Sequence, residues 1–230
     1  MTNSILQSVF NLFLKPECPL CARPTDQEFC HYCQQQLLEC QFTHPGLFPG
    51  QVPIFVWGRY GGVLKRAIAA LKYDGNPQIA KMLGYCLAEG WLNTVNRVPQ
   101  NLVVVPIPLH PDKLKKRGFN QAELLGRGFC EITGLSMKPH ALQRVKNTEA
   151  LHGLSRQQRY QNLQGALRVG KNQLPPRSSV LIIDDIYTTG ATIDAAIQAL
   201  KLKKIKVAGV VALATTASPQ SSPGSLSSIG

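Results

Sequence analysis

The sequence predicts an α/β protein in which helices flank a mostly parallel sheet and a small metal-binding module precedes it. Three segments are almost wholly aliphatic and have the length of strands, namely residues 102–108, 180–183 and 207–213. Uninterrupted aliphatic strands suit a parallel sheet that is covered on both faces. Two closely spaced pairs of cysteines near the start of the chain indicate the additional module.

Length and composition indicate a globular protein with a polyanionic ligand. The 230 residues suffice for one ordinary domain plus a small module, and 44% of them are hydrophobic. Lysine and arginine number 25 against 13 aspartates and glutamates, a formal charge of +12. Such an excess favours phosphates, pyrophosphate, nucleic acid or an anionic surface as the partner, and composition does not choose among them.

The start of the chain carries no targeting or membrane signal. No apolar run is long enough to span a bilayer, so we predict no transmembrane segment. Residues 5–14 lack the basic start and the cleavage site of a signal peptide, and we expect a short amphipathic helix there. An odd count of seven cysteines argues for metal binding in a reducing cytosol rather than a disulfide framework, so the predicted location is cytoplasmic.

The chain divides into three predicted regions. Residues 1–45 are expected to form an N-terminal helix and a four-cysteine zinc module, residues 46–216 the α/β domain, and residues 217–230 a disordered tail. Proline and glycine between Thr43 and Pro53 mark the first boundary, and a run of serine, proline and glycine from Ser218 marks the second.

Four cysteines have the spacing of a zinc site. Cys18 and Cys21 form one C-x-x-C pair, and Cys30 and Cys33 form a second. Four thiolates make a closed tetrahedral site with no position left for a substrate, so the zinc would be structural. The alternative is a redox dithiol, which needs only one such pair beside a βαβ unit.

The first elements of the main domain follow from periodicity. We expect a strand at residues 55–60, a helix at 62–72 and a second helix at 79–92, because apolar residues recur there at helical spacing. Lys72 ends the first helix, where a cation complements the helix dipole.

A basic cluster follows the predicted strand at residues 102–108. Pro106 and Pro108 mark where this strand leaves the sheet. Four basic residues come next, Lys113, Lys115, Lys116 and Arg117, and then a predicted helix at 122–129. Open α/β sheets bind ligands at the carboxyl ends of their strands, so the cluster is placed to face a pyrophosphate. The alternative is a solvated basic turn.

Residues 144–168 are polar and basic and lie between two predicted core strands. Such a segment is a candidate lid that closes over a phosphorylated substrate. The alternative is a plain surface excursion.

The most specific stretch is Val180–Thr192, which predicts a sugar-phosphate site. Asp184 and Asp185 follow the aliphatic run, and we expect them at the strand's end because two ionised acids cannot both sit in an apolar core. A small, hydroxyl-rich loop then precedes a helix and is suited to hold an anion: Thr188, Thr189, Gly190, Ala191 and Thr192. The carboxylates would accept hydrogen bonds from ribose hydroxyls. The alternative is an ordinary connection in which these residues form a turn and a helix cap.

This stretch resembles the phosphoribosyl-pyrophosphate-binding motif of the type I phosphoribosyltransferases. From about Cys18 to Leu213 the chain also resembles the ComF family, which joins zinc ribbons to a phosphoribosyltransferase-like domain. The resemblance rests on the cysteine pairs, the acidic stretch and four further motifs: Leu71–Gly75, Pro106–His110, Arg117–Gln121, and Gly153–Arg156 with Arg159 and Asn162. It implies a type I phosphoribosyltransferase-like sheet behind a zinc-ribbon module. Many relatives carry a second cysteine cluster where this chain keeps only Cys40, so we expect one zinc ion.

The resemblance also implies roles for individual residues. Asp184 and Asp185 would be the catalytic acids that hold the ribose hydroxyls, with Arg117 close by, and the loop at 188–192 would cradle the 5-phosphate. The pyrophosphate would face the backbone of four residues, Pro106, Ile107, Pro108 and Leu109. Magnesium would bridge pyrophosphate and ribose oxygens with few protein ligands, as suits an ion that keeps its waters.

The ComF family implies a role in natural competence, that is, in DNA uptake and the handling of single-stranded DNA. The implied partners are phosphoribosyl pyrophosphate, single-stranded DNA and competence-machinery proteins such as a helicase or type IV pilus components, through which the protein would reach the membrane. Four aromatic residues near basic ones are candidates to stack bases: Tyr60, Tyr73, Phe119 and Tyr160. Two other functions stay open, a magnesium-dependent phosphoribosyltransferase (glycosyltransferase class) with an unknown acceptor and a regulator that senses phosphoribosyl pyrophosphate.

Overall fold

A six-stranded, mostly parallel sheet forms the centre of the protein. The computed structural model describes residues 16–43, 47–48, 50–146, 163, 165–171 and 174–217. The strand order is β1-β2-β8-β7-β3-β4, and every neighbouring pair is parallel except β1 with β2. The strands of this sheet are β1 (Leu47–Phe48), β2 (Ile54–Arg59), β3 (Leu102–Pro106), β4 (Ser136–Met137), β7 (Ser179–Tyr187) and β8 (Lys206–Thr215). A separate antiparallel pair joins β5 (Leu142–Arg144) to β6 (Leu167–Val169).

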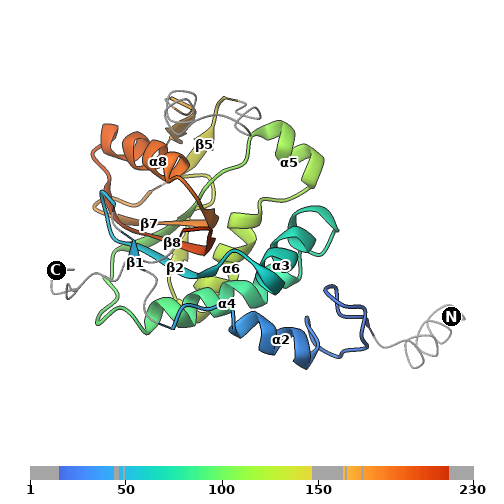
Figure 1. The fold of residues 1–230 in the computed structure, drawn as a ribbon. Coiled ribbons are helices and arrows are strands. Elements are labelled where there is room, and N and C mark those ends of the chain that lie inside the picture. Colours follow the sequence, from blue (N-terminus) through green and yellow to red (C-terminus); the bar gives the residue numbers. More distant parts are fainter. Residues whose placement is uncertain are drawn as a thin grey trace, which may run out of the picture.

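Helices cover both faces of the sheet (Figure 1). One face packs against α3 (Gly62–Tyr73), α4 (Ile79–Leu92) and α6 (Gln121–Thr133), and its core continues into α2 (His31–Leu38). The other face packs against α8 (Ala191–Leu202) and the β5–β6 pair. Successive residues of a strand point to opposite faces, so Val180 and Ile182 of β7 lie in the α8 core, whereas Leu181 and Ile183 lie in the core beneath α4 and α6.

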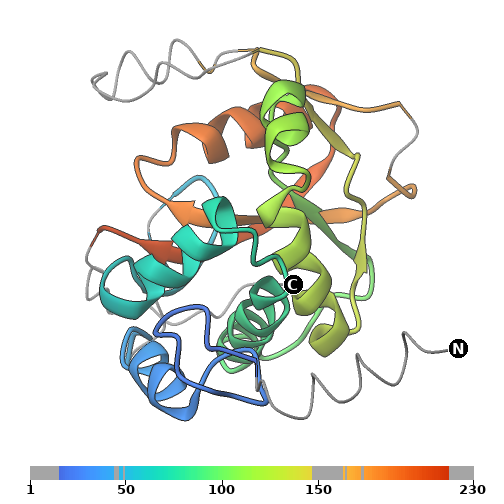
Figure 2. The ribbon, with the colours of Figure 1, turned by 90° about the vertical axis from the view of Figure 1, so that its right-hand side faces the viewer.

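The carboxyl edge of the sheet is stepped. β3 ends with Pro106 opposite Ile183, whereas β7 and β8 stay paired as far as Tyr187 and Thr215. The short helix α5 (Pro111–Arg117) follows β3 at this edge, and Figure 2 shows α5 and α8 at the end of the molecule opposite α2. The last residues of β7 therefore project beyond β3 toward the segments that come after it.

Most of the elements expected from periodicity are confirmed. The helix expected at 79–92 has those bounds, and the strands and helices expected at 55–60, 62–72, 102–108, 122–129 and 207–213 all form, with ends shifted by a few residues. The basic cluster forms helix α5 and not a turn. Pro111 stands at its first position and Gly118, with φ of 84°, ends it in the left-handed conformation. The expected helix at 5–14, most of the candidate lid and the tail from Ser218 lie outside the described residues.

The N-terminal module shares the core of the main domain. Phe29 and Leu37 are fully buried in the cluster that includes α3 and α4. The separation of residues 1–45 from 46–216 stays a prediction. Within the described ranges, no helix combines the length and apolarity needed to cross a membrane.

Helices α4 and α6 approach closely through two buried glycines. A Cβ atom on Gly84 would overlap the carbonyl of Leu125, and one on Gly128 would lie 2.5 Å from the carbonyl oxygen of Lys81. Since both obstacles are backbone atoms, they cannot rotate away. Only glycine at both positions allows this helix pair to pack as it does.

We expect Gly128→Ala to lower the free energy of unfolding by about 1–3 kcal/mol, the usual cost of overpacking. Urea denaturation measures the change. Gly61→Ala is the matched control, because its Cβ would meet nothing within 4 Å and its φ of −171° suits any residue. Equal stability of Gly128→Ala and the wild type would contradict the close packing of α4 on α6.

Candidate functional site

The carboxyl edge of the sheet brings together the segments that the sequence singled out. The Ile107 N–H donates to the carbonyl of Ile183 at 2.9 Å, which holds the segment Pro106–Leu109 beside the end of β7. Asn120 fixes the same segment from α6, because its side-chain nitrogen donates to the Ile107 carbonyl at 3.0 Å while its oxygen caps the helix at Ala122. The segment expected to face pyrophosphate is thus held against the strand that carries the two acids.

Asp184 and Asp185 lie inside strand β7, which corrects the expectation that they come after its end. Asp184 pairs with Ala212 of β8, and the strand continues through Tyr187. Both acids are buried, with 9% and 4% of their surface exposed. The burial is tolerated because one of them has a counter-ion and the other favours its neutral form, as the next contacts show.

Asp185 faces α3 and α6, and both of its carboxylate oxygens have partners there. The Lys72 ammonium, at the end of α3, forms an ion pair with its Oδ2. Gln121, in the first turn of α6, donates from Nε2 to its Oδ1 at 3.1 Å. These two partners lie on different helices, so the acid ties α3 and α6 to the centre of the sheet.

The pKa values of the two acids shift in opposite directions. Burial alone would raise the pKa of Asp185, but the Lys72 ammonium and the Gln121 amide outweigh it and lower that pKa. The pKa of Lys72 is raised. Burial alone would lower it, but the charge of Asp185 outweighs that effect. Burial and the neighbouring Asp185 charge raise the pKa of Asp184 well above its ordinary value. The site therefore holds one charged acid and one that binds a proton readily.

Arg117 lies at the rim of this network. Its guanidinium donates to the Oε1 of Gln121, the residue that also contacts Asp185. The same guanidinium lies 5.6 Å from the ring centre of Tyr73, which follows Lys72 and is 74% exposed. Both partners of Asp185 are thus linked to the surface. Lys72 is followed in the chain by Tyr73, Gln121 contacts Arg117, and Arg117 and Tyr73 lie beside each other.

The loop at residues 188–192 leads directly into the N-terminus of α8. Gly190 has φ of 79° and is the N-cap of α8, with no side-chain cap. Thr188 is exposed, Thr189 and Thr192 are half-buried, and Ala191 opens the helix with its side chain buried. A helix N-terminus without a side-chain cap presents backbone N–H groups and a partial positive charge to an anion.

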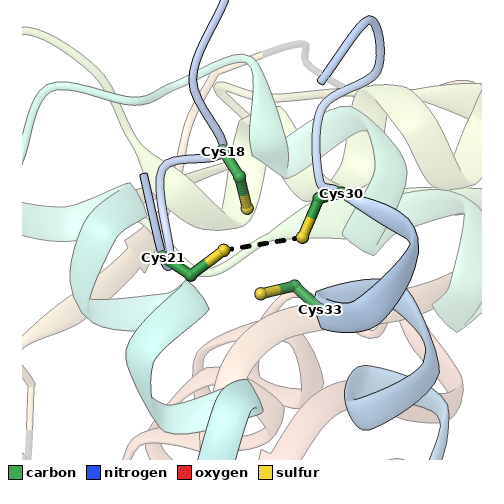
Figure 3. Close-up of side chains that lie close together, drawn as sticks. All are labelled: Cys18, Cys21, Cys30 and Cys33. Carbon is green, nitrogen blue, oxygen red and sulfur yellow. Dashed lines mark hydrogen bonds between the residues drawn. The ribbon is translucent and has the colours of Figure 1, made fainter. Parts of the chain in front are cut away.

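The four cysteines form one cluster at the other end of the molecule (Figure 3). Their Sγ atoms all lie within 4.8 Å of one another, close to the edge of about 3.8 Å expected for four sulfurs around one zinc ion. Cys18 and Cys21 come from a tight turn, and Cys30 and Cys33 from the start of α2. A hydrogen bond from the Cys33 backbone N–H lowers the pKa of Cys30 to about 7, whereas burial raises the pKa of Cys33.

Sequence reasoning singled out the acids, the loop and the cysteines, but it put the acids at the strand's end and missed their contacts with Lys72 and Gln121. It assigned Lys72 to the helix dipole, and it gave Gln121 and Asn120 no role. Both regions belong to the motifs Leu71–Gly75 and Arg117–Gln121, which was the available signal. Periodicity does not show which partner a polar side chain at a helix end will choose.

Comparisons with known proteins agree with this architecture. A family model described as "Phosphoribosyl transferase domain" matches residues 134–225. "Competence protein F" of Haemophilus influenzae is 28% identical over 72% of this chain and 75% of its own length. "Competence protein ComFC" of Bacillus subtilis is 27% identical over 84% and 74%, and "DNA utilization protein YhgH" of Salmonella typhimurium is 30% identical over 76% and 80%.

We expect Asp184→Asn to raise the free energy of unfolding at neutral pH. Because the pKa of Asp184 is raised in the folded protein, this acid lowers the free energy of unfolding at every pH above the pKa of the unfolded acid. The gain should therefore be absent near pH 4, around the unfolded pKa, and grow as pH rises. Denaturant titrations between pH 4 and 8 measure it. Exposed Asp74→Asn is the control, and a variant less stable than wild type at pH 8 would refute the assignment.

Proposed function

Because this chain belongs to the ComF family, we propose that it acts in natural competence and binds phosphoribosyl pyrophosphate at the carboxyl edge of its sheet. The observation that carries this proposal is the convergence of the acid pair, the loop before α8 and the segment Pro106–Leu109 at one edge. Ligands of open α/β sheets bind at this edge. The names of the relatives direct the function toward the handling of incoming DNA.

Each part of the ligand has a matching group in the proposed site. The 5-phosphate binds the N–H groups and hydroxyls of Thr188–Thr192, and the ribose hydroxyls donate to Asp184 and Asp185. The pyrophosphate lies against Pro106–Leu109, near Arg117. Magnesium, when bound with the ligand, neutralises pyrophosphate charge. The cysteine cluster holds one structural zinc ion, since four thiolates leave no open coordination position.

The protein surface beside this site suits single-stranded nucleic acid. The exposed face of α5 carries Lys115 and Lys116, and Lys113 is half-buried in the same helix. The exposed ring of Tyr73 stands beside Arg117 at the end of this helix. Basic groups that follow a backbone, combined with an aromatic face that stacks a base, are the features of sequence-tolerant single-strand binding.

The proposed cellular setting follows from competence. Single-stranded DNA entering the cell is handled together with other proteins, so we include a helicase and pilus-associated proteins among the partners, with a cytoplasmic location and contact with the membrane through them. Transfer of the phosphoribosyl group to an acceptor is a second candidate activity, favoured by the same acid pair. A regulator that senses phosphoribosyl pyrophosphate would use this site too.

The proposed sugar-phosphate site is tested by calorimetric titration with phosphoribosyl pyrophosphate and magnesium. We expect the wild type to bind and Asp185→Asn to lose at least about tenfold in affinity, because the hydroxyl acceptor becomes a neutral amide. Glu89→Gln, an exposed acid on α4, should bind like the wild type. Absence of binding by the wild type would overturn the sugar-phosphate proposal.

The DNA surface is tested with a fluorescent single-stranded oligonucleotide. Affinity of the wild type should fall steeply with added salt, because binding releases counter-ions from the phosphates. Replacing Lys115 and Lys116 by Gln should weaken binding by roughly tenfold and reduce the salt slope by about 2. The control removes the same charge at the opposite edge, at the exposed Lys203 and Lys204 beyond the end of α8. Equal losses in both double variants would refute an α5 surface and indicate diffuse attraction.

A further inference from the structure

Lys72 occupies the place on Asp185 that a ribose hydroxyl needs. Its ammonium lies against Oδ2, and Gln121 holds Oδ1 at 3.1 Å. The Asp185 side chain is 6% exposed and that of Lys72 15%. Each carboxylate oxygen could accept a second hydrogen bond, but the burial of Asp185 leaves no open approach, so a hydroxyl can reach it only after a covering side chain has moved.

Lys72 is the partner that can move. It ends α3, and its four-carbon stem is flexible. Gln121 is less free, because it stands in the first turn of α6 and also accepts from Arg117. The segment Pro106–Leu109 lies close by, since the Ile107 N–H bonds to Ile183, two residues before Asp185. The segment proposed to face the pyrophosphate is therefore the nearby candidate partner for an ammonium that leaves Asp185.

Building on the proposed sugar-phosphate site, we propose that Lys72 determines ligand specificity by exchanging partners. In the ligand-free protein its ammonium pairs with Asp185. When the ribose hydroxyls bind Asp185, the ammonium transfers to an oxygen of the ligand's pyrophosphate. No covalent bond changes and no proton is transferred. Asp185 keeps donors around it, and the ammonium keeps an anionic partner.

The exchange makes the site selective for a ligand that carries a pyrophosphate group. Ribose 5-phosphate offers the same hydroxyls and the same 5-phosphate, yet it leaves the displaced ammonium without an anion. A buried charge that loses its counter-ion is strongly unfavourable. Lys72 therefore makes the site prefer phosphoribosyl pyrophosphate over the sugar monophosphate.

The test compares the affinities of phosphoribosyl pyrophosphate and ribose 5-phosphate by calorimetry, with magnesium present. The preference for the pyrophosphate is the ratio of the two dissociation constants. We expect Lys72→Met to reduce this ratio by at least about tenfold, because the neutral side chain lowers affinity for the pyrophosphate and no longer opposes ribose 5-phosphate. Lys72→Arg, which keeps the charge, should retain most of the ratio. Lys65→Met, exposed on the same helix, should retain all of it.

The outcomes separate this proposal from the one it rests on. Failure of the wild type to bind phosphoribosyl pyrophosphate overturns both. Wild-type binding with an unchanged ratio in Lys72→Met overturns the role of Lys72 alone. A second measurement needs no destabilised variant: the ¹⁵Nζ resonance of Lys72 in the wild type, assigned by its absence from Lys72→Arg. It should shift with phosphoribosyl pyrophosphate, and an unshifted resonance at saturation refutes the exchange.

Discussion

The ion pair between Lys72 and Asp185 is the contact on which the centre of the structure depends. A strand between two helical layers has no water to solvate a carboxylate, so an acid there needs a counter-ion and hydrogen-bond donors. α3 supplies the ammonium and α6 supplies the Gln121 amide. Buried ion pairs seldom add net stability, because desolvation offsets their attraction. A buried ion pair at the carboxyl edge of the sheet is therefore better explained by the proposed ligand site than by a contribution to stability.

Strand geometry explains why two neighbouring acids behave differently. Adjacent residues of β7 point to opposite faces, so Asp185 meets Lys72 and Gln121 of the α3–α6 layer. Asp184 accepts the backbone N–H of Asp185 at 2.9 Å and has a raised pKa. A single residue of register shift would exchange the two environments. The pairing of β7 with β8 up to Tyr187 fixes this register, and with it the charge state of each acid.

Hydrophobic periodicity in the sequence predicted the helices and strands whose own residues carry the pattern. The apolar period of α4 is carried by its own residues, and the expected bounds match the observed ones. Helix α5 was not predicted, because its one large apolar residue, Leu114, is 42% exposed and the helix therefore has no apolar periodicity. Strands β1 and β4 have two residues each, too few for any period. The burial of the two acids was not predicted, because the counter-ion of Asp185 lies on a helix far away in the sequence and only the fold brings it near.

Helix α3 lies between the N-terminal module, which contacts its start, and Asp185, which pairs with Lys72 at its end. The Cys40 carbonyl, just beyond α2, accepts the Arg59 N–H at 2.8 Å, and the Cys40 Sγ lies 3.8 Å from the carbonyl of Gly61, the N-cap of α3. Phe29 and Leu37 pack into the same core as α3. Lys72 stands at the far end of that helix. A metal in the cluster would thus take no part in chemistry at the sheet edge, but it would fix the module that anchors the start of α3. Because Lys72 lies at the other end of α3, a metal in the four-cysteine cluster would bear on the charged site only through the position of this helix.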